Sequence, residues 1–162
     1  MLEHRVRPFE EGRALELIQE LSGLEGPMLP ILHALQEEFG YVDRAAIPLI
    51  AEALNVSLAE VHGTISFYHY FHGEPVGRHV LKICRAEACQ SMGVDKLLAH
   101  LKNAHGLGPG ETLPGGHLTV EAVYCLGHCA ASPACLIDGE PVGRLDATRL
   151  DALVAEAVGG RS

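Results

Sequence analysis

Four cysteines lie in two short segments of the chain. Cys84 and Cys89 form a C-x4-C pair, and Cys125 and Cys129 form a C-x3-C pair after 35 intervening residues. Because each pair closes only a tiny loop, bringing two pairs to one place costs less chain entropy than gathering four scattered cysteines. The layout therefore predicts a metal centre with thiolate ligands.

The spacing within each pair bears on the kind of metal. Structural zinc sites usually have C-x2-C pairs around one ion, whereas C-x4-C and C-x3-C suit a larger two-iron cluster in which each pair holds its own iron. Spacing favours a 2Fe-2S cluster and leaves zinc open as the alternative. A Rieske centre needs one Cys and one His from each loop, and only the second loop, CLGHCAASPAC, contains a histidine.

The N-terminal segment, MLEHRVRPFEEGR, carries charges of both signs and lacks the apolar stretch of a secretory signal. No apolar run approaches the roughly 20 residues that a membrane span requires. We therefore expect a soluble, cytoplasmic protein without direct membrane insertion. Cysteines stay reduced in that compartment, which favours metal ligation over disulfides.

Composition is that of an ordinary globular protein. The chain has 162 residues, of which 48% are hydrophobic and 20% charged, and this length can bury one core or two small ones. With 21 acidic and 12 basic side chains the net charge is −9. Because no Lys/Arg cluster is present, we expect no nucleic acid partner.

Residues 1–75 are predicted to form an N-terminal helical array. Apolar residues at helical intervals mark helices around residues 15–21, 28–39 and 47–54. Ser57 and Glu60 have the spacing of a capping box, which predicts a fourth helix. The apolar stripe of that helix would consist of Leu58, Val61, Ile65 and Tyr68.

Residues 76–162 are predicted to form a second domain, a small α/β sandwich, so the predicted fold class of the whole chain is α+β or α/β. Segments 79–84 and 118–123 are typical of strands, and each leads into a cysteine pair. Between them, an apolar stripe at 94–101 predicts a helix and residues 106–116 a loop. Asp138 and Gly139 predict a hairpin turn, and Asp146 the cap of a last helix.

Three stretches of sequence carry a resemblance to a known family. They are GPMLPILHALQEEFGYV and TISFYHYF in the first part, and CLGHCAASPACLIDGE followed by VGRL in the second. With the cysteine spacing, and over residues 20–157, they resemble the thioredoxin-like 2Fe-2S subunit of complex I and its relatives in NAD-linked hydrogenases. The resemblance implies an N-terminal helical bundle followed by a thioredoxin-like 2Fe-2S ferredoxin domain.

The resemblance also implies a site and partners. Cys84, Cys89, Cys125 and Cys129 would be the ligands of one 2Fe-2S cluster. The chain would relay electrons in an NAD-linked oxidoreductase and would not be catalytic alone. Its partners would be an FMN- and NAD-binding flavoprotein subunit and a larger iron-sulfur/molybdenum subunit. The resemblance places FMN, NAD and the molybdenum cofactor on those partners only, and the chain itself shows no G-x-G-x-x-G fingerprint for a dinucleotide.

Within that family, the segment CRAEACQSMG looks closest to the gamma subunit of soluble NAD-dependent formate dehydrogenase. Formate dehydrogenase is the predicted parent complex, with complex I or an NAD-linked hydrogenase as the alternative. A zinc-stabilised interaction module is an alternative of a different class. A dithiol enzyme on the same fold would need a C-x-x-C pair, which the sequence lacks.

Residues near the cysteine pairs can be interpreted either as functional or as structural. Cys135 is predicted to be a small buried side chain and not a ligand. His128 either donates a hydrogen bond to a ligand sulfur, tuning the cluster, or is an exposed loop residue. Arg85 either raises the potential by its charge or forms an ion pair with Glu87 or the partner.

The remaining aromatic and histidine side chains are predicted to serve packing or surface roles. One aromatic group consists of Phe67, Tyr68, Tyr70 and Phe71. Some of these side chains are expected to pack inside the protein, and the others to form an exposed patch that faces a partner. The scattered histidines, which are not expected to be ligands, include His33, His62, His69, His72 and His79.

Overall fold

The computed structural model describes residues 6–159, so residues 1–5 and 160–162 of the predicted domains lie outside the described part. The described chain divides into two compact units, residues 6–75 and residues 76–159. Within residues 6–159, no helix has both the length and the apolar character needed to cross a membrane.

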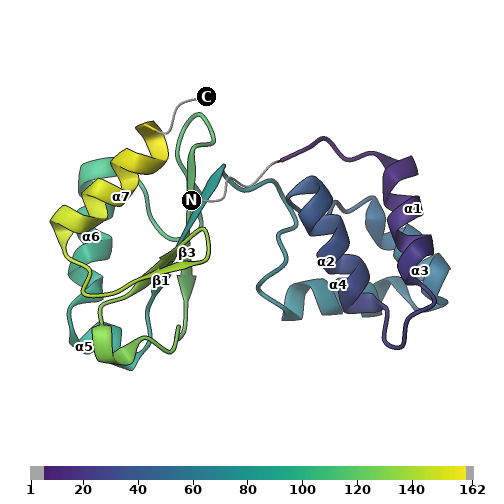
Figure 1. Ribbon diagram of the computed structural model, residues 1–162, viewed down its shortest axis with the longest axis horizontal. Helices are drawn as coiled ribbons and strands as arrows, with labels where there is room; N and C mark the ends of the chain where they lie inside the picture. The colour runs from purple at the N-terminus through teal and green to yellow at the C-terminus, as the bar shows by residue number, and fades with distance from the viewer. Residues whose placement is uncertain (1–5, 160–162) are drawn as a thin grey trace. The chain divides into compact units, whose positions relative to one another are not determined.

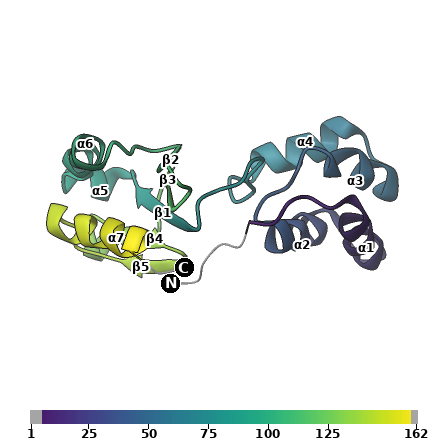
Figure 2. The same ribbon diagram turned by 90° about the horizontal axis from the view of Figure 1, so that it is seen from above.

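The first unit consists of four helices. They are α1 (Glu11–Leu21), α2 (Met28–Phe39), α3 (Ala46–Leu54) and α4 (Leu58–Phe67). Figure 2 shows α1 and α2 in one layer and α3 and α4 in another. Their apolar faces meet in one core, which includes Ile18, Leu32, Leu35, Ile50 and Val61. The predicted helices at the N-terminus are therefore confirmed.

Helix α4 begins as predicted but buries less of its surface than predicted. The Ser57 Oγ accepts a hydrogen bond from the Glu60 N–H at 3.2 Å, and the Glu60 carboxylate accepts one from the Ser57 N–H at 2.8 Å. Of the expected stripe, Val61 is fully buried, but Leu58 is 57% exposed and Tyr68 43% exposed. Tyr68 follows the end of α4 with an extended backbone, so the helical period no longer decides where its side chain points.

The second unit is a mixed sheet with helices. In chain order it contains β1 (His79–Cys84), α5 (Glu87–Ser91), α6 (Val94–His105), β2 (Glu111–Thr112), β3 (Leu118–Val123), the 3-10 turn η1 (Cys129–Ala131), β4 (Cys135–Ile137), β5 (Glu140–Val142) and α7 (Ala147–Gly159). The strand order is β2-β3-β1-β4-β5. Strands β1 and β3 are parallel, and the other neighbours are antiparallel.

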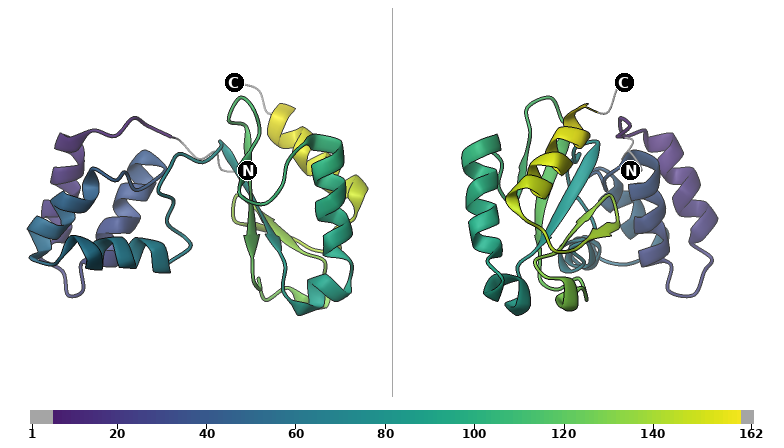
Figure 3. Two further views of the ribbon diagram at one scale, coloured as in Figure 1. Left: turned by 180° about the vertical axis from the view of Figure 1, so that it is seen from behind. Right: turned by 60° about the vertical axis from the view of Figure 1, so that its left-hand side comes forward.

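Helices α6 and α7 lie side by side on one face of this sheet (Figures 1 and 3). Ile83 of β1, Leu101 of α6 and Leu150 of α7 are fully buried in one core. Burial of several such side chains, at about 1.5–3 kcal/mol each, holds the two helices on the sheet. The result is the mixed α+β architecture expected from the sequence.

Local signals in the second unit are mostly confirmed, with two exceptions. Asp138 and Gly139 turn the β4–β5 hairpin with φ of 50° and 88°, and the Asp146 Oδ1 accepts from the Arg149 N–H at 2.8 Å at the start of α7. The predicted loop 106–116 contains β2, an exposed two-residue strand paired with β3. The short helix α5 was not predicted, because five residues carry too little periodicity to be recognised.

Candidate metal centre

The parallel pairing of β1 with β3 brings the two cysteine pairs to one end of the sheet. Cys84 is the last residue of β1 and is paired in register with Val123, the last residue of β3. Cys89 lies in α5, which Figure 1 shows at one end of the sheet. Cys125 and Cys129 follow β3, and Cys129 opens η1.

The four thiols associate as two pairs. Cys89 lies close enough to Cys84 to lower the pKa of that thiol, and Cys125 lies close enough to Cys129 to raise the pKa of that one. Electrostatic interaction also links Cys129 with Cys84 and with Cys89, across the pairs. The first pair is buried, at 3% and 2% exposure, and the second is exposed. The structure thus brings together all four cysteines that the sequence singled out.

Backbone N–H groups converge on the sulfur of Cys84. Burial alone would raise the pKa of this thiol, but hydrogen bonds from the backbone of Ala86, the Cys89 side chain, and the backbone of Cys125 and Leu126 bring it below its usual range. Such donors stabilise negative charge on sulfur. A site built this way favours a thiolate in a place that excludes most water.

The other thiols repel one another as charges. Burial raises the pKa of Cys89, and its neighbour Cys84 raises it further. The pKa of Cys129 is raised by its hydrogen bond with Cys125, by the charge of Cys125 and then by burial. Several close thiolates therefore require a cation among them to be ionised together, which is what a metal centre supplies.

The backbone of the second loop is bent around its first cysteine. Cys125 has φ of 103°, in the left-handed region that non-glycine residues avoid. The Gly127 N–H donates to the Cys125 Sγ at 3.4 Å. Positive-φ residues outside turns cluster at functional sites, so this conformation supports a specific task for the loop.

The spread of the sulfurs bears on which of the two metals considered would fit. Four sulfurs around one zinc ion, at Zn–S of about 2.3 Å, would lie about 3.8 Å from one another. Within residues 6–159, no three cysteine sulfurs lie within 4.8 Å of one another, since the one group meeting that limit contains no cysteine. Sulfurs spread more widely than this fit a two-iron cluster, in which each pair would bind its own iron, better than a single ion.

The structure shows where the three other side chains singled out near the cysteine pairs lie. Cys135 is fully buried in β4, and burial raises its pKa to about 12, so it stays a neutral thiol; the prediction of a small buried side chain is confirmed. His128 is exposed in its loop. Arg85 forms an ion pair with Asp95 at 3.6 Å rather than with Glu87. Tuning of a cluster by His128 or Arg85 stays a prediction.

The aromatic and histidine side chains that were predicted to have packing or surface roles include both buried and exposed ones. Phe67 and Tyr70 are 73% and 50% exposed, whereas Phe71 is buried in the helical core. His79 is buried and its Nδ1 lies 2.7 Å from the Asp138 Oδ2. A docking role for the exposed aromatic residues stays a prediction.

One cluster was missed from the sequence. His100 and His105 of α6 meet Asp151 of α7, although 46 to 51 residues separate the histidines from the aspartate. No motif spacing signals a group assembled from two distant helices. Only knowing that α6 and α7 pack together would have revealed it.

Comparison with known proteins finds a matching family and related chains. The family described as thioredoxin-like [2Fe-2S] ferredoxin matches residues 14–158. A subunit of the NADH-quinone oxidoreductase of Rhizobium meliloti (strain 1021) is 37% identical over 127 residues, covering 78% of this chain and 76% of that protein. NADP-reducing hydrogenase subunit HndA of Solidesulfovibrio fructosivorans is 29% identical over 155 residues, covering 95% of this chain and 91% of that one.

A crystal structure of NAD+-reducing [NiFe]-hydrogenase in the air-oxidized state is also similar. Its TM-score is 0.67 with 31% identity, over 81% of this chain and 23% of that hydrogenase chain. The chain therefore spans about a quarter of the hydrogenase chain it matches. On the family match and the 37% identical relative, the chain belongs to the thioredoxin-like [2Fe-2S] ferredoxin family.

Proposed function

We propose that the chain is the small electron-transfer subunit of an NAD-linked oxidoreductase, and that Cys84, Cys89, Cys125 and Cys129 hold its one 2Fe-2S cluster. The observation that carries this proposal is the meeting of two thiol pairs at one end of the sheet. The relatives support it, since they are subunits of NADH-quinone oxidoreductase and of hydrogenase. Residues 1–75 and 76–162 are proposed as two domains, the second carrying the cluster.

The chain's contribution to electron transfer is to hold charge in a low-water environment. When bound, the cluster supplies one-electron chemistry, at a net charge of about −2 oxidised and about −3 reduced. The N–H groups around Cys84 offset part of that charge. Cys84 and Cys89 bury one side of the site, while Cys125 and Cys129 leave the other side exposed.

The exposed side is the place where an electron carrier of another subunit would approach. A flavoprotein subunit that binds FMN and NAD is the proposed donor or acceptor, with NAD chemistry confined to it. The names of the relatives, which include an NADP-reducing hydrogenase subunit, support a nicotinamide-linked assembly. The exposed aromatic side chains Phe67 and Tyr70 are the proposed contribution of the helical unit to docking.

The parent assembly that the relatives favour is of the NADH-quinone oxidoreductase or NAD-linked hydrogenase kind. An NAD-dependent formate dehydrogenase, with molybdenum in a larger iron-sulfur subunit, is a second candidate. It rests on the segment CRAEACQSMG between β1 and α6. Purification of the assembly from the native source, followed by activity assays, separates these parents. Hydrogen-dependent formation of NADH would select a hydrogenase, formate-dependent formation of NADH would select formate dehydrogenase, and quinone reduction by NADH would select NADH-quinone oxidoreductase.

The cluster itself is tested by anaerobic purification in the presence of EDTA. Two irons and two sulfides per chain, with an EPR signal that appears on dithionite reduction, are expected for a Cys-ligated 2Fe-2S cluster. A colourless chain that holds one zinc ion through sulfur and no iron would instead select the zinc-stabilised interaction module. Zinc bound without sulfur ligands, beside an intact iron cluster, would leave the proposed function unchanged.

A further inference from the structure

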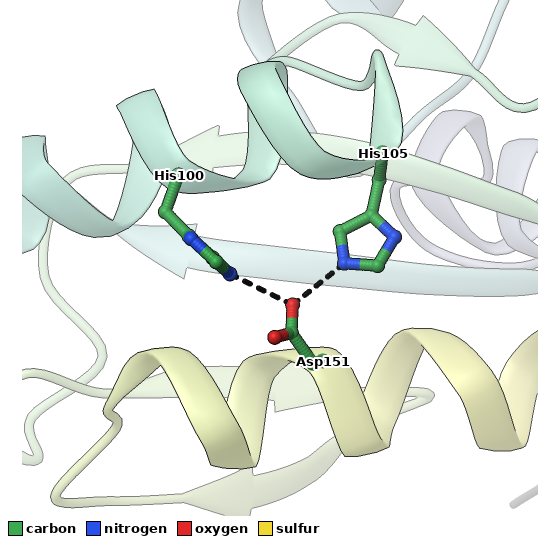
Figure 4. A group of neighbouring side chains, drawn as sticks. All are labelled: His100, His105 and Asp151. Carbon is green, nitrogen blue, oxygen red and sulfur yellow. Dashed lines mark hydrogen bonds and ion pairs between the residues drawn. The ribbon is translucent and has the colours of Figure 1, made fainter.

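A second set of metal-binding side chains lies away from the cysteine loops. Within residues 6–159, His100, His105 and Asp151 are the one group of three or more His, Cys, Asp or Glu residues whose ligand atoms all lie within 4.8 Å of one another. The His100 Nε2 is 2.8 Å and the His105 Nε2 is 2.6 Å from the same oxygen, Asp151 Oδ1. Figure 4 shows both imidazole edges pointing at this carboxylate.

Rigid elements hold the three side chains. His100 and His105 lie on α6, and Asp151 lies on the adjacent helix α7. The neighbouring residues Leu101 and Leu150 are fully buried in the core beneath. Because both helices are fixed by this core, the two imidazoles and the carboxylate are brought together by the fold, which lowers the ordering cost of binding a ligand.

The local charge and exposure suit a cation. Hydrogen bonds first from His105 and then from His100 hold the pKa of Asp151 below its usual range, so the carboxylate is anionic at neutral pH. The side chains of His105, His100 and Asp151 are 25%, 34% and 43% exposed. A metal ion would thus have three ligands from the protein and an open side for water.

We propose that His100 Nε2, His105 Nε2 and the Asp151 carboxylate bind one divalent transition-metal ion of the zinc class. Two imidazoles and one carboxylate are a common zinc donor set that leaves a fourth position for water. Imidazole nitrogen disfavours Mg²⁺ and Ca²⁺, which prefer oxygen ligands. Before binding, each Nε2–H donates a hydrogen bond to Asp151. On binding, each Nε2 gives up that proton, which a neutral ring takes back from water at Nδ1, and offers its lone pair to the metal.

The ion joins two helices that are distant in sequence. Bound there, it replaces two hydrogen bonds to Asp151 with coordinate bonds and cross-links α6 to α7. A ligand that binds only the folded state raises its stability by RT ln(1 + [L]/Kd), so the melting temperature should rise with the concentration of free zinc. The site therefore acts as a metal clip on the sheet unit, separate from the electron-transfer centre.

The test is a zinc titration of the full chain with its cluster intact, followed by calorimetry and by visible absorption. One zinc ion per chain is expected to bind while the cluster absorption stays unchanged. His105→Gln and Asp151→Asn should each weaken zinc binding by about tenfold or more. His62→Gln, a change of an exposed histidine in α4, is the matched control and should bind zinc like the parent chain.

X-ray absorption at the zinc edge makes the test independent of whether the variants fold. A first shell of nitrogen and oxygen with imidazole scattering is expected for the parent chain. Sulfur in the first shell, or bleaching of the cluster on zinc addition, would place zinc at the cysteines and overturn the proposal. Absence of binding to the parent chain, with lower melting temperatures for the two variants, would show that the three side chains form only an ion pair between helices.

Discussion

Cys125 and Cys135 are ten positions apart in sequence but lie in opposite environments. Cys125 is exposed beside Cys129, whereas Cys135 is fully buried in β4. Cys125→Ala is expected to lower the iron bound per chain by about tenfold or more, because it removes a ligand, and even the loss of an outer-shell partner costs metal affinity by about 10–100-fold. Cys135→Ala, the matched control, should keep its iron and lose about 1 kcal/mol of stability. Iron analysis and visible absorption check both; equal loss of iron from the two variants would contradict the ligand assignment.

Burial also predicts how Cys135 responds to pH. Because its pKa is raised to about 12, about one thiol in ten thousand is ionised at pH 8, and only the thiolate reacts with iodoacetamide. In the folded chain with its iron removed by a chelator, Cys125 and Cys129 should be alkylated and Cys135 should not. Mass spectrometry after labelling in buffer and in urea checks this, since urea should expose Cys135. Labelling of Cys135 in the folded chain would show that β4 opens.

The sign of the linked stability change follows from the same pKa. A thiol that ionises at higher pH when folded than when unfolded stabilises the fold at pH values below its unfolded pKa. That contribution is lost as the pH rises from about 9 towards 12. The stability of the parent chain relative to Cys135→Ala should therefore fall over this interval.

Residue-level prediction from sequence worked where the chemistry is local. The pairs Cys84/Cys89 and Cys125/Cys129 were recognisable as candidate metal ligands because the two members of each pair lie close together in the chain. The cluster of His100, His105 and Asp151 does not, because its members meet only through the packing of α6 on α7. The ion pair of Arg85 with Asp95 was also missed, since Arg85 follows β1 whereas Asp95 lies in the first turn of α6, with α5 between them in the chain.

At the scale of elements, β5 and the segment after it support the second cysteine loop. The Arg144 N–H donates to the Ala131 carbonyl at 2.6 Å, and the Leu145 N–H donates to the Pro133 carbonyl at 2.9 Å. Between them and β5 lies Gly143, where an added Cβ would stand 2.6 Å from the Ala131 Cβ and 2.9 Å from the Ala131 carbonyl oxygen. This glycine therefore lets the chain pass directly over η1, which begins at Cys129.

Gly143→Ala is expected to push η1 away and to cost about 1–3 kcal/mol, because backbone has to move to make room. Iron content should fall together with the melting temperature. Gly108→Ala is the matched control, since its nearest neighbour is the flexible Glu111 carboxylate at 3.4 Å; it should change stability by less than about 1 kcal/mol and leave the iron unchanged. If Gly143→Ala melts like Gly108→Ala and keeps its iron, the close approach has no consequence for the site.

Long elements were predictable because periodicity and caps agree over many residues. Helices α1 to α4 and the strands β1 and β3 show this. The elements missed, α5 and β2, have five and two residues, and depend on neighbours already in place. The exposed Leu58 shows the converse, since an apolar residue at a helix end need not face the core.

At the scale of the molecule, the two units have separate cores. The helical core gathers residues from 14 to 71, and the sheet core gathers residues from 81 to 157. All four paired cysteines belong to the second unit. Stability and metal binding should therefore be separable between the units.

The segment joining the units is the place to test this separation. Gly73, Glu74 and Pro75 are exposed, while the hydrogen bonds from the Val42 N–H to the His72 carbonyl and from the Arg78 N–H to the Gly116 carbonyl hold the chain on either side. Exposed, small or polar linker residues are preferred sites of proteolysis. Brief digestion by proteinase K is expected to cut first within residues 73–75.

The fragment that begins there should keep the visible absorption and the EPR signal of the cluster, because its sheet, its helices and both cysteine loops are intact. Digestion of the urea-unfolded chain is the control and should give no large fragment. First cuts inside α1 to α4 or the sheet, or bleaching at the same rate as cutting, would mean that each unit depends on the other for its fold. Retention of the signal on the fragment would place the whole electron-transfer site in residues 76–162.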